Sequence, residues 1–139
     1  MEKKTTLVLF TSSYPYGMTE YTFLNPETEY LVSKFDQIII VPTNPIGAKK
    51  KLSNKICVEK SYAKLCKHDS LIAKIFLILC AFFSISFYRQ FASKPTIVFH
   101  PKKLSRLIAF VGEAENTKKW IDAFMRIKGL DPKNTILYT

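Results

Sequence analysis

The chain has 139 residues with 47% hydrophobic and 14% aromatic content, values that are typical of a folded globular domain and that argue against disorder. Its formal net charge of +10 is unevenly spread: residues 1–48 hold three Lys and five acidic residues, residues 49–74 hold eight Lys and two, and residues 75–139 hold ten Lys plus Arg and four. Such a field attracts nucleotide phosphates, nucleic acid or an anionic membrane, although a solvated, solubilising face accounts for it equally well.

The first forty residues predict a strand, a helix and a second strand. Leu7–Phe10 is a short apolar run that ends in turn residues, which indicates a buried strand. Asn25-Pro26 supplies an N-cap followed by a proline at the first helical position. Ile38–Val41 is an unbroken β-branched run stopped by Pro42, and a strand of this kind is usually buried on both faces of a parallel sheet. We therefore predict a βαβ unit.

The rest of the chain predicts a short third strand or edge strand, three helices and a final strand. The expected helices cover Leu71–Phe91, Leu104–Val111 and Asn116–Lys128, the last ended by glycine at 129. The expected strands cover Lys55–Glu59 and Thr135–Thr139. The predicted fold class is α/β, with a parallel Rossmann-like sheet and an added helical part. Because a domain seldom ends on a buried parallel strand, we expect the sequence to be truncated.

The loop Thr11–Glu20 is the first candidate site, because it lies where a strand passes into a helix and parallel sheets bind ligands there. Its tyrosines could form a wall, and Gly17 would let the backbone approach a phosphate or sugar closely. A plain surface turn is the alternative interpretation. The chain contains neither a Gly-x-Gly-x-x-Gly pattern nor a Walker motif.

Several of these segments together resemble the opening of GT-B glycosyltransferases of the family 4 or family 1 type. The similarity includes the strand at 7–10, the turn-rich phrase at 11–17, a phrase of the form E-x-x-F-L-x-x-E-x-x-x-L starting at Glu20, and a strand ending in Val41-Pro42. Residues 107–139 are also similar to a subset linked to bacterial surface polysaccharides, in which paired helices precede a strand of the I-L-Y-T kind. The resemblance covers most of residues 1–139 and is weak over residues 60–100.

The resemblance implies the N-terminal, acceptor-side part of an enzyme that transfers sugar from a nucleotide-sugar donor, without a metal or other cofactor, to a glycan or lipid-linked acceptor. By position, Gly17 is similar to the loop glycine near the donor phosphates, and Tyr14, Tyr16 and Glu20 are similar to acceptor-side residues. The family's donor-gripping residues lie in a second domain that this sequence lacks. No catalytic residue is assigned, and we expect the chain alone to be inactive.

The apolar stretch at 71–91 raises the question of a membrane. Its uncharged part, Ile75–Tyr88, is shorter than the roughly 20 residues that span a bilayer. A core helix, an in-plane membrane helix and a true span all remain open. In the in-plane case, nearby lysines would contact the anionic surface: Lys49, Lys50, Lys51, Lys64, Lys67 and Lys74. The rival function is thus a non-catalytic, basic module that binds a membrane surface.

Other partner classes have little support in the sequence. The three cysteines, Cys57, Cys66 and Cys80, are an odd number without Cys-x-x-Cys spacing, so neither a disulfide framework nor zinc is predicted. Cys66, His68 and His100 are too scattered to predict a metal site. Reduced thiols favour a cytoplasmic protein, peripheral on the inner face of the membrane if it docks there. We expect no nucleic-acid partner, since no aromatic-interleaved recognition motif accompanies the lysines. Self-association through an open sheet edge remains an alternative.

Overall fold

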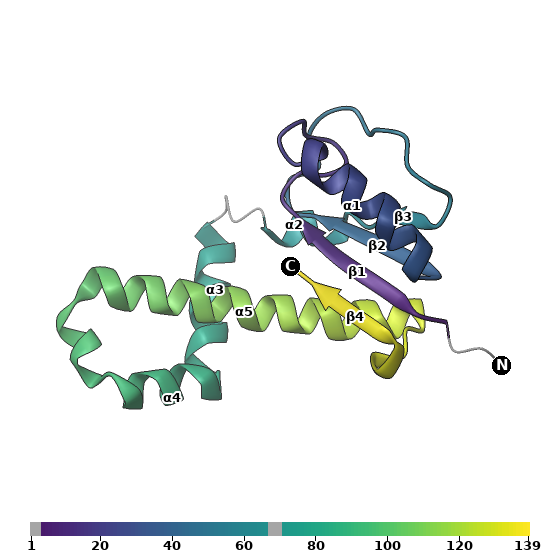
Figure 1. Cartoon of the computed structure of the whole chain (residues 1–139). Coiled ribbons are helices and arrows are strands. Elements are labelled where there is room, and N and C mark those ends of the chain that lie inside the picture. The colour runs from purple at the N-terminus through teal and green to yellow at the C-terminus, as the bar shows by residue number, and fades with distance from the viewer. Residues whose placement is uncertain (1–3, 67–70) are drawn as a thin grey trace. The chain divides into compact units, whose positions relative to one another are not determined.

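The computed structural model describes residues 4–66 and 71–139, and it contains a four-stranded parallel sheet (Figure 1). The strands are arranged in the order β3-β2-β1-β4, and every neighbouring pair is parallel. Their bounds are β1 (Thr6–Thr11), β2 (Gln37–Pro42), β3 (Ile56–Val58) and β4 (Thr135–Tyr138). The predicted α/β class with a Rossmann-like parallel sheet is confirmed.

Helices make up most of the remaining described residues, and the chain divides into two compact units. The sheet unit comprises Met1–Lys67 and Met125–Thr139, and the helical unit comprises His68–Phe124. The helices are α1 (Tyr21–Lys34), α2 (Ser61–Cys66), α3 (Leu71–Phe82), α4 (Ile85–Ser93) and α5 (Pro101–Lys128), with short 3-10 helices η1 (Pro95–Phe99) and η2 (Pro132–Asn134).

The core of the sheet unit lies on both faces of β1 and β2. On one face, Leu7 and Leu9 sit beside Ile38 and Ile40 in register and pack with Leu24 of α1. Burying each such side chain contributes roughly 1.5–3 kcal/mol. The opposite face, which alternation assigns to Val8, Phe10, Ile39 and Val41, is also mostly buried, and Phe10 meets Tyr62 of α2 edge-on at 5.5 Å between ring centroids. Burial on both faces explains why these strands are unbroken apolar runs.

The predicted start of the first helix is wrong. Instead of beginning at Pro26, α1 begins at Tyr21, and Pro26 lies inside it. The Leu24 N–H already donates to the Glu20 carbonyl at 2.9 Å, so helical bonding starts before the proline. Pro26 has no N–H for the carbonyl of Thr22. Because Thr22 is exposed, that carbonyl is open to water, which reduces the cost of the missing bond.

The single long helix predicted over Leu71–Phe91 is also wrong. The chain forms α3 and α4 with a turn between them, and the segments Ile75–Phe82 and Ile85–Ser93 bend by 71°. The break occurs at Ser84, whose extended backbone and side chain cap α4 by accepting a hydrogen bond from the Ser86 N–H at 3.1 Å. Its hydroxyl also donates to Glu115 Oε1 at 2.6 Å.

The two helices predicted near the C-terminal end are one continuous helix, α5. Gly112, near the predicted break, lies inside α5 and is buried. A Cβ at this position would lie 2.5 Å from the carbonyl oxygen of Leu77 in α3, so glycine is needed for close helix contact rather than as a breaker. The predicted end of the helix is confirmed: α5 stops at Lys128 and Gly129 has a φ of +63°.

Candidate functional site

The sheet order places one loop at the position where parallel sheets usually bind ligands. From β1 the chain crosses to β2 and β3 on one side, whereas β4 pairs with β1 on the other side. The carboxyl ends of β1 and β4 therefore form a topological switch point, and the crevice outside such a point is the usual ligand site in open α/β sheets. The loop after β1, Ser12–Glu20, begins at this switch point.

The carboxylate of Glu20 holds this loop in shape. It accepts hydrogen bonds from three consecutive backbone N–H groups, those of Ser12 at 2.9 Å, Ser13 at 2.6 Å and Tyr14 at 2.8 Å. Successive N–H groups that converge on one point form an anion-binding concavity. Here that concavity is filled by the protein's own carboxylate, so a ligand anion would bind these amides only by displacing Glu20.

The pKa of Glu20 reflects this environment. Burial by itself raises the pKa of the carboxyl, but the backbone N–H donors of Ser13, Ser12 and Tyr14 and the Ser13 hydroxyl lower it more, and the net pKa lies below the ordinary value. Glu20 is therefore an anion under neutral conditions. The acceptor-side role of Glu20 remains a prediction. Its hydrogen bonds show that it stabilises the conformation of the loop.

Tyr14 is fully buried under α1. Its hydroxyl shares a hydrogen bond with the Thr28 hydroxyl at 3.0 Å, and its ring lies 6.0 Å from that of Tyr21. Burial raises the pKa of the Tyr14 phenol above its ordinary value. Thr28 in turn donates to the Asn25 carbonyl at 2.8 Å, so the loop is tied to the first half of α1. Because its side chain is buried, Tyr14 would affect a bound ligand indirectly, by setting the conformation of the loop.

Tyr16 is 7% exposed, and its hydroxyl is buried without a hydrogen-bond partner. A buried phenol without a partner is rare, since desolvating a hydroxyl without a hydrogen bond costs about 1–3 kcal/mol. The ammonium of Lys60, two residues beyond β3, lies 4.8 Å from the centroid of the Tyr16 ring. Tyr16 therefore joins the loop after β1 to the segment after β3 at the carboxyl edge of the sheet.

Gly17 closes the turn of the same loop. Its N–H donates to the Ser13 carbonyl at 3.1 Å, and a Cβ added at Gly17 would overlap the Ser13 side chain, 2.8 Å from its Cβ. Nearby, Gly47 has a φ of +113° and a built Cβ would lie 3.2 Å from the carbonyl oxygen of Tyr16. Both glycines allow a close backbone approach. The role of Gly17 near donor phosphates remains a prediction.

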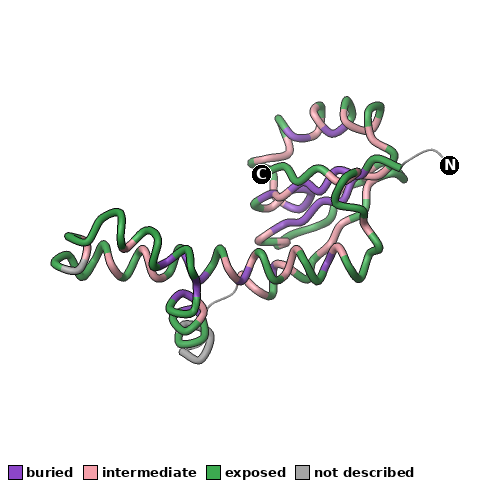
Figure 2. The backbone as a smooth tube through the Cα atoms, turned by 90° about the horizontal axis from the view of Figure 1, so that it is seen from below, coloured by how far each residue is buried: buried purple, intermediate pink, exposed green. Residues whose placement is uncertain are grey.

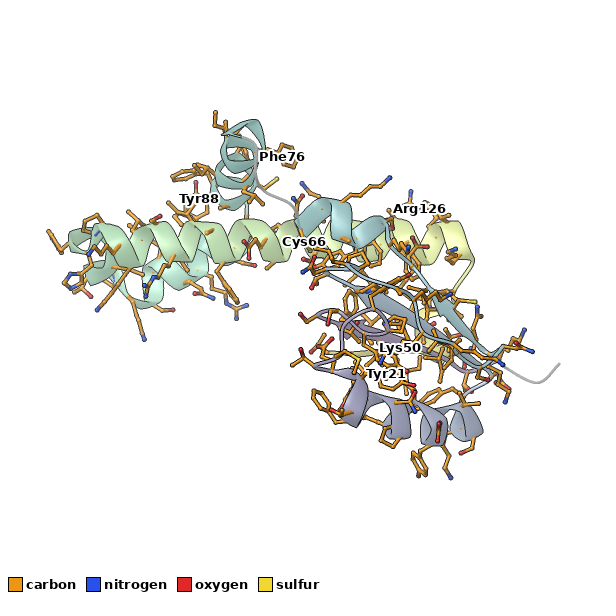
Figure 3. All side chains as sticks on the ribbon, turned by 90° about the horizontal axis from the view of Figure 1, so that it is seen from above. Tyr21, Lys50, Cys66, Phe76, Tyr88 and Arg126 are labelled. Atoms are coloured by element: carbon orange, nitrogen blue, oxygen red, sulfur yellow. The ribbon has the colours of Figure 1, made fainter. Side chains whose placement is uncertain are left out.

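The structure describes the side chains of four of the six lysines that the sequence singles out. Lys50 turns onto the ring of Tyr21, with its ammonium 3.5 Å from the ring centroid, as the labelled side chains in Figure 3 show. Lys49, Lys51 and Lys64 are exposed. Lys67 and the side chain of Lys74 lie outside the described part of the structure.

Two contacts near the loop were missed from the sequence. One is the stacking of Lys50 on Tyr21, and the other is the Lys60 ammonium over Tyr16. The second had a usable signal, because Lys60 directly follows the predicted strand Lys55–Glu59 and so had to lie near the carboxyl ends of the strands. The first had none, since Lys50 is one of three adjacent lysines in an irregular loop.

Each unit has its own pocket. In the sheet unit, a pocket of about 240 Å³ lies between α1 and the loop before β3, with polar and apolar lining that includes Asn25, Glu29, Lys51 and Leu52. In the helical unit, a mostly apolar groove of about 510 Å³ lies between α3 and α5, and Glu113 is the one charged residue among its described lining residues. Of the residues Ser12–Gly17, only Tyr14 lines either of these two pockets.

The described residues offer no clear metal centre and no simple membrane span. Within residues 4–66 and 71–139, no group of three or more His, Cys, Asp or Glu side chains is placed to hold a metal ion. In the same part of the chain, no single helix is long and apolar enough to cross a membrane. The bent pair Ile75–Phe82 and Ile85–Ser93 meets that requirement only when its two arms are counted together.

No protein-family model, curated protein or solved structure matches this chain. Function must therefore be inferred from the sheet topology and from the chemistry of the residues at its carboxyl edge.

Proposed function

We propose that this chain is the acceptor-side part of a GT-B glycosyltransferase, which transfers sugar from a nucleotide-sugar donor to a glycan or lipid-linked acceptor in surface-glycan synthesis. The observation that carries the proposal is the position of the loop Ser12–Glu20 at the switch point between β1 and β4. This is the same segment whose residues resemble the opening of that family.

The construction of the loop is consistent with a ligand-binding role. Glu20 fixes its backbone amides, and the Asn44 N–H donates to the Ser12 carbonyl at 2.7 Å, which ties the loop to the segment after β2. A loop held in this way is preorganised, and preorganisation reduces the entropy lost when a ligand binds. Ser12, Asn44 and Lys60 are exposed along this edge and present hydroxyl, amide and ammonium groups of the kind that bind sugars and phosphates.

The proposal is tested by titrating the isotope-labelled chain, followed by nuclear magnetic resonance, with nucleotide sugars that carry uridine, guanosine or thymidine diphosphate. We expect one donor to shift the amide signals of Ser12–Gly17. Gly17→Ala should weaken that binding about tenfold or more, because the added Cβ displaces Ser13.

Gly129→Ala is the control for backbone strain outside the loop, because a Cβ there meets no atom within 4 Å but the φ of +63° strains an alanine. Circular dichroism of both variants should show an intact fold. Signal shifts confined to residues other than this loop, or equal weakening by both variants, would contradict the proposal.

A further inference from the structure

A second surface, in the helical unit, is too apolar to be left in water. Eight large hydrophobic side chains that lie within fourteen positions of α3, α4 and their turn are at least 42% exposed. We call this set the apolar hairpin surface, and it consists of Ile75, Phe76, Ile78, Leu79, Phe82, Phe83, Ile85 and Tyr88. Exposed apolar patches larger than a few hundred Å² mark sites that bind a protein or a membrane.

The sequence of α3 lacks the polar face that a surface helix normally has. Of its described side chains, only Leu77 and Ala81, one turn apart, are buried. The other sides carry Phe, Ile and Leu. Figure 2 shows how much of this unit is exposed, since purple is concentrated in the strands of the sheet unit. A helix that is hydrophobic on every side is found in a protein interior or in lipid.

The turn between α3 and α4 hides its polar groups and presents apolar ones. The N–H groups of Phe83, Ser84 and Phe87 donate to the carbonyls of Leu79, Ala81 and Ser84 at 3.0–3.2 Å. The Ser84 side chain is buried and bonded to Glu115, whereas Phe83 and Ile85 on either side of it are 87% and 84% exposed. Satisfied backbone groups beneath protruding apolar side chains are what immersion in hydrocarbon requires.

The dimensions favour insertion into one leaflet rather than a crossing. The two arms contain 8 and 9 residues, so each is about 12–14 Å long and covers less than half of the roughly 30 Å hydrocarbon core. The bend of 71° prevents them from acting as one straight span. Helices of this kind lie at the boundary between headgroups and acyl chains.

Charge identifies the type of bilayer. The described part of the helical unit has seven exposed Lys and Arg side chains and three carboxylates. One of these cations, Lys119, lies against the base of the hairpin, 5.9 Å from the centroid of the Phe76 ring and 3.6 Å from the sulfur of Cys80. Cations next to an inserted apolar surface attract anionic headgroups at about 1 kcal/mol each. The cations are Arg89, Lys94, Lys102, Lys103, Arg106, Lys118 and Lys119.

We propose that the α3–α4 hairpin docks this protein on an anionic lipid bilayer, with Phe83 and Ile85 inserted among the acyl chains and the Lys and Arg side chains of the same unit at the headgroups. Tyr88 and Phe76, labelled in Figure 3, lie on α4 and α3, the two arms of the hairpin. The inference does not depend on glycosyl transfer, because it rests only on the helical unit.

Vesicle flotation tests the docking directly. The chain should float with vesicles made of equal parts phosphatidylglycerol and phosphatidylcholine, and float less with pure phosphatidylcholine. Phe83→Ser combined with Ile85→Ser should lower the partition coefficient about tenfold or more, because two large apolar side chains no longer enter hydrocarbon. Ile46→Ser is the matched control, since Ile46 is 68% exposed in the sheet unit and its loss should leave flotation unchanged.

Insertion is separated from simple charge attraction by a fluorescent probe. Phe83→Trp, placed in a Trp120→Phe background so that it is the only tryptophan, should shift to shorter emission wavelength with vesicles and be quenched by brominated acyl chains. The same probe at Ile46 should respond to neither. Lys102→Glu with Lys103→Glu should remove most of the preference for phosphatidylglycerol.

Three results would overturn the proposal. The native chain could fail to float with any vesicle, or it could float equally well after Phe83 and Ile85 are changed. It could also form a dimer in sedimentation that the same double change converts to a monomer, without vesicle binding, in which case a second copy of the chain covers this surface.

Discussion

At the scale of single residues, the loop after β1 depends most on Glu20. The carboxylate accepts from three backbone N–H groups, so we expect Glu20→Gln to lower the free energy of unfolding. The amide of Gln brings an NH₂ group to donors that need an acceptor, and loss of charge-assisted hydrogen bonds at this half-buried position costs about 1–2 kcal/mol. Urea unfolding measures the effect, with the exposed Glu29→Gln as the control that should change little.

The same residue predicts a dependence on pH. Because the pKa of Glu20 in the folded state is lower than in the unfolded state, its contribution to stability is complete above the unfolded pKa and is lost as the pH falls through the folded pKa. The Glu20→Gln variant has no carboxylate at this position, so its stability does not include this pH-dependent contribution. The difference in stability between the native chain and the variant should therefore shrink in acid, and a difference that stays constant would show that the carboxylate charge does not matter.

At the scale of elements, the close contact of α3 with α5 depends on Gly112. Alanine is the better helix former by about 1 kcal/mol, so Gly112→Ala would stabilise an isolated helix. In this protein the added Cβ would lie 2.5 Å from the oxygen and 3.0 Å from the carbon of the Leu77 carbonyl, both backbone atoms. We expect a net loss of about 1–3 kcal/mol from overpacking, and more for Gly112→Val.

The fluorescence of Trp120 reports this loss, because Trp120 stacks on Phe124 at 4.8 Å within the helical unit. Ala114→Gly, at an exposed position two residues along α5, measures the difference in helix propensity between alanine and glycine away from this contact. A Gly112→Ala variant more stable than the native chain would mean that α3 moves away from α5 at no cost.

At this scale the strands were predicted more accurately than the helix limits. The strands were predicted well, because Leu7–Phe10 and Ile38–Val41 are buried on both faces. A strand buried in this way has an unbroken apolar sequence, which can be recognised directly. Helix limits failed at Pro26, Ser84 and Gly112. At Ser84 and Gly112 a contact with another helix decides the outcome, whereas at Pro26 local helical bonding begins before the proline. The Leu24 N–H bonds to the Glu20 carbonyl ahead of the proline, Glu115 binds the serine at which the long helix breaks, and the glycine between the two predicted helices lies against Leu77.

The position of the candidate loop could be predicted from the sequence, but its geometry could not, and its role as a site remains a prediction. The loop Thr11–Glu20 could be located because a strand-to-helix passage in a parallel sheet indicates a ligand site whatever its residues are. The direction of its side chains could not. Nothing in the spacing of Tyr14, Tyr16 and Glu20 shows that the two tyrosines turn inward or that the glutamate binds the backbone of its own loop.

At the scale of the whole molecule, burial is concentrated in one of the two units. The sheet unit contains the strands with fully buried Val8, Ile38 and Ile40, whereas many large apolar side chains of α3 and α4 are exposed. The edge strand β4 is also poorly covered, with Leu137 43% and Ile136 54% exposed. Self-association through this edge remains a prediction, since an open strand offers unpaired backbone groups to another chain.

The uneven burial predicts that the two units open separately. In native-state hydrogen exchange without lipid, amides of β1 and β2 should be the slowest, because exposing them requires loss of the whole core around Leu9 and Ile40. Amides of α3 and α4 should exchange at least about a hundredfold faster, since little buried apolar surface opposes their opening. Mass spectrometry of peptic fragments measures both sets. Equal protection of the two units would mean that the chain unfolds as one cooperative body, and the helical unit would then owe its stability to the sheet unit rather than to its small core of Ala81, Phe87 and Val111.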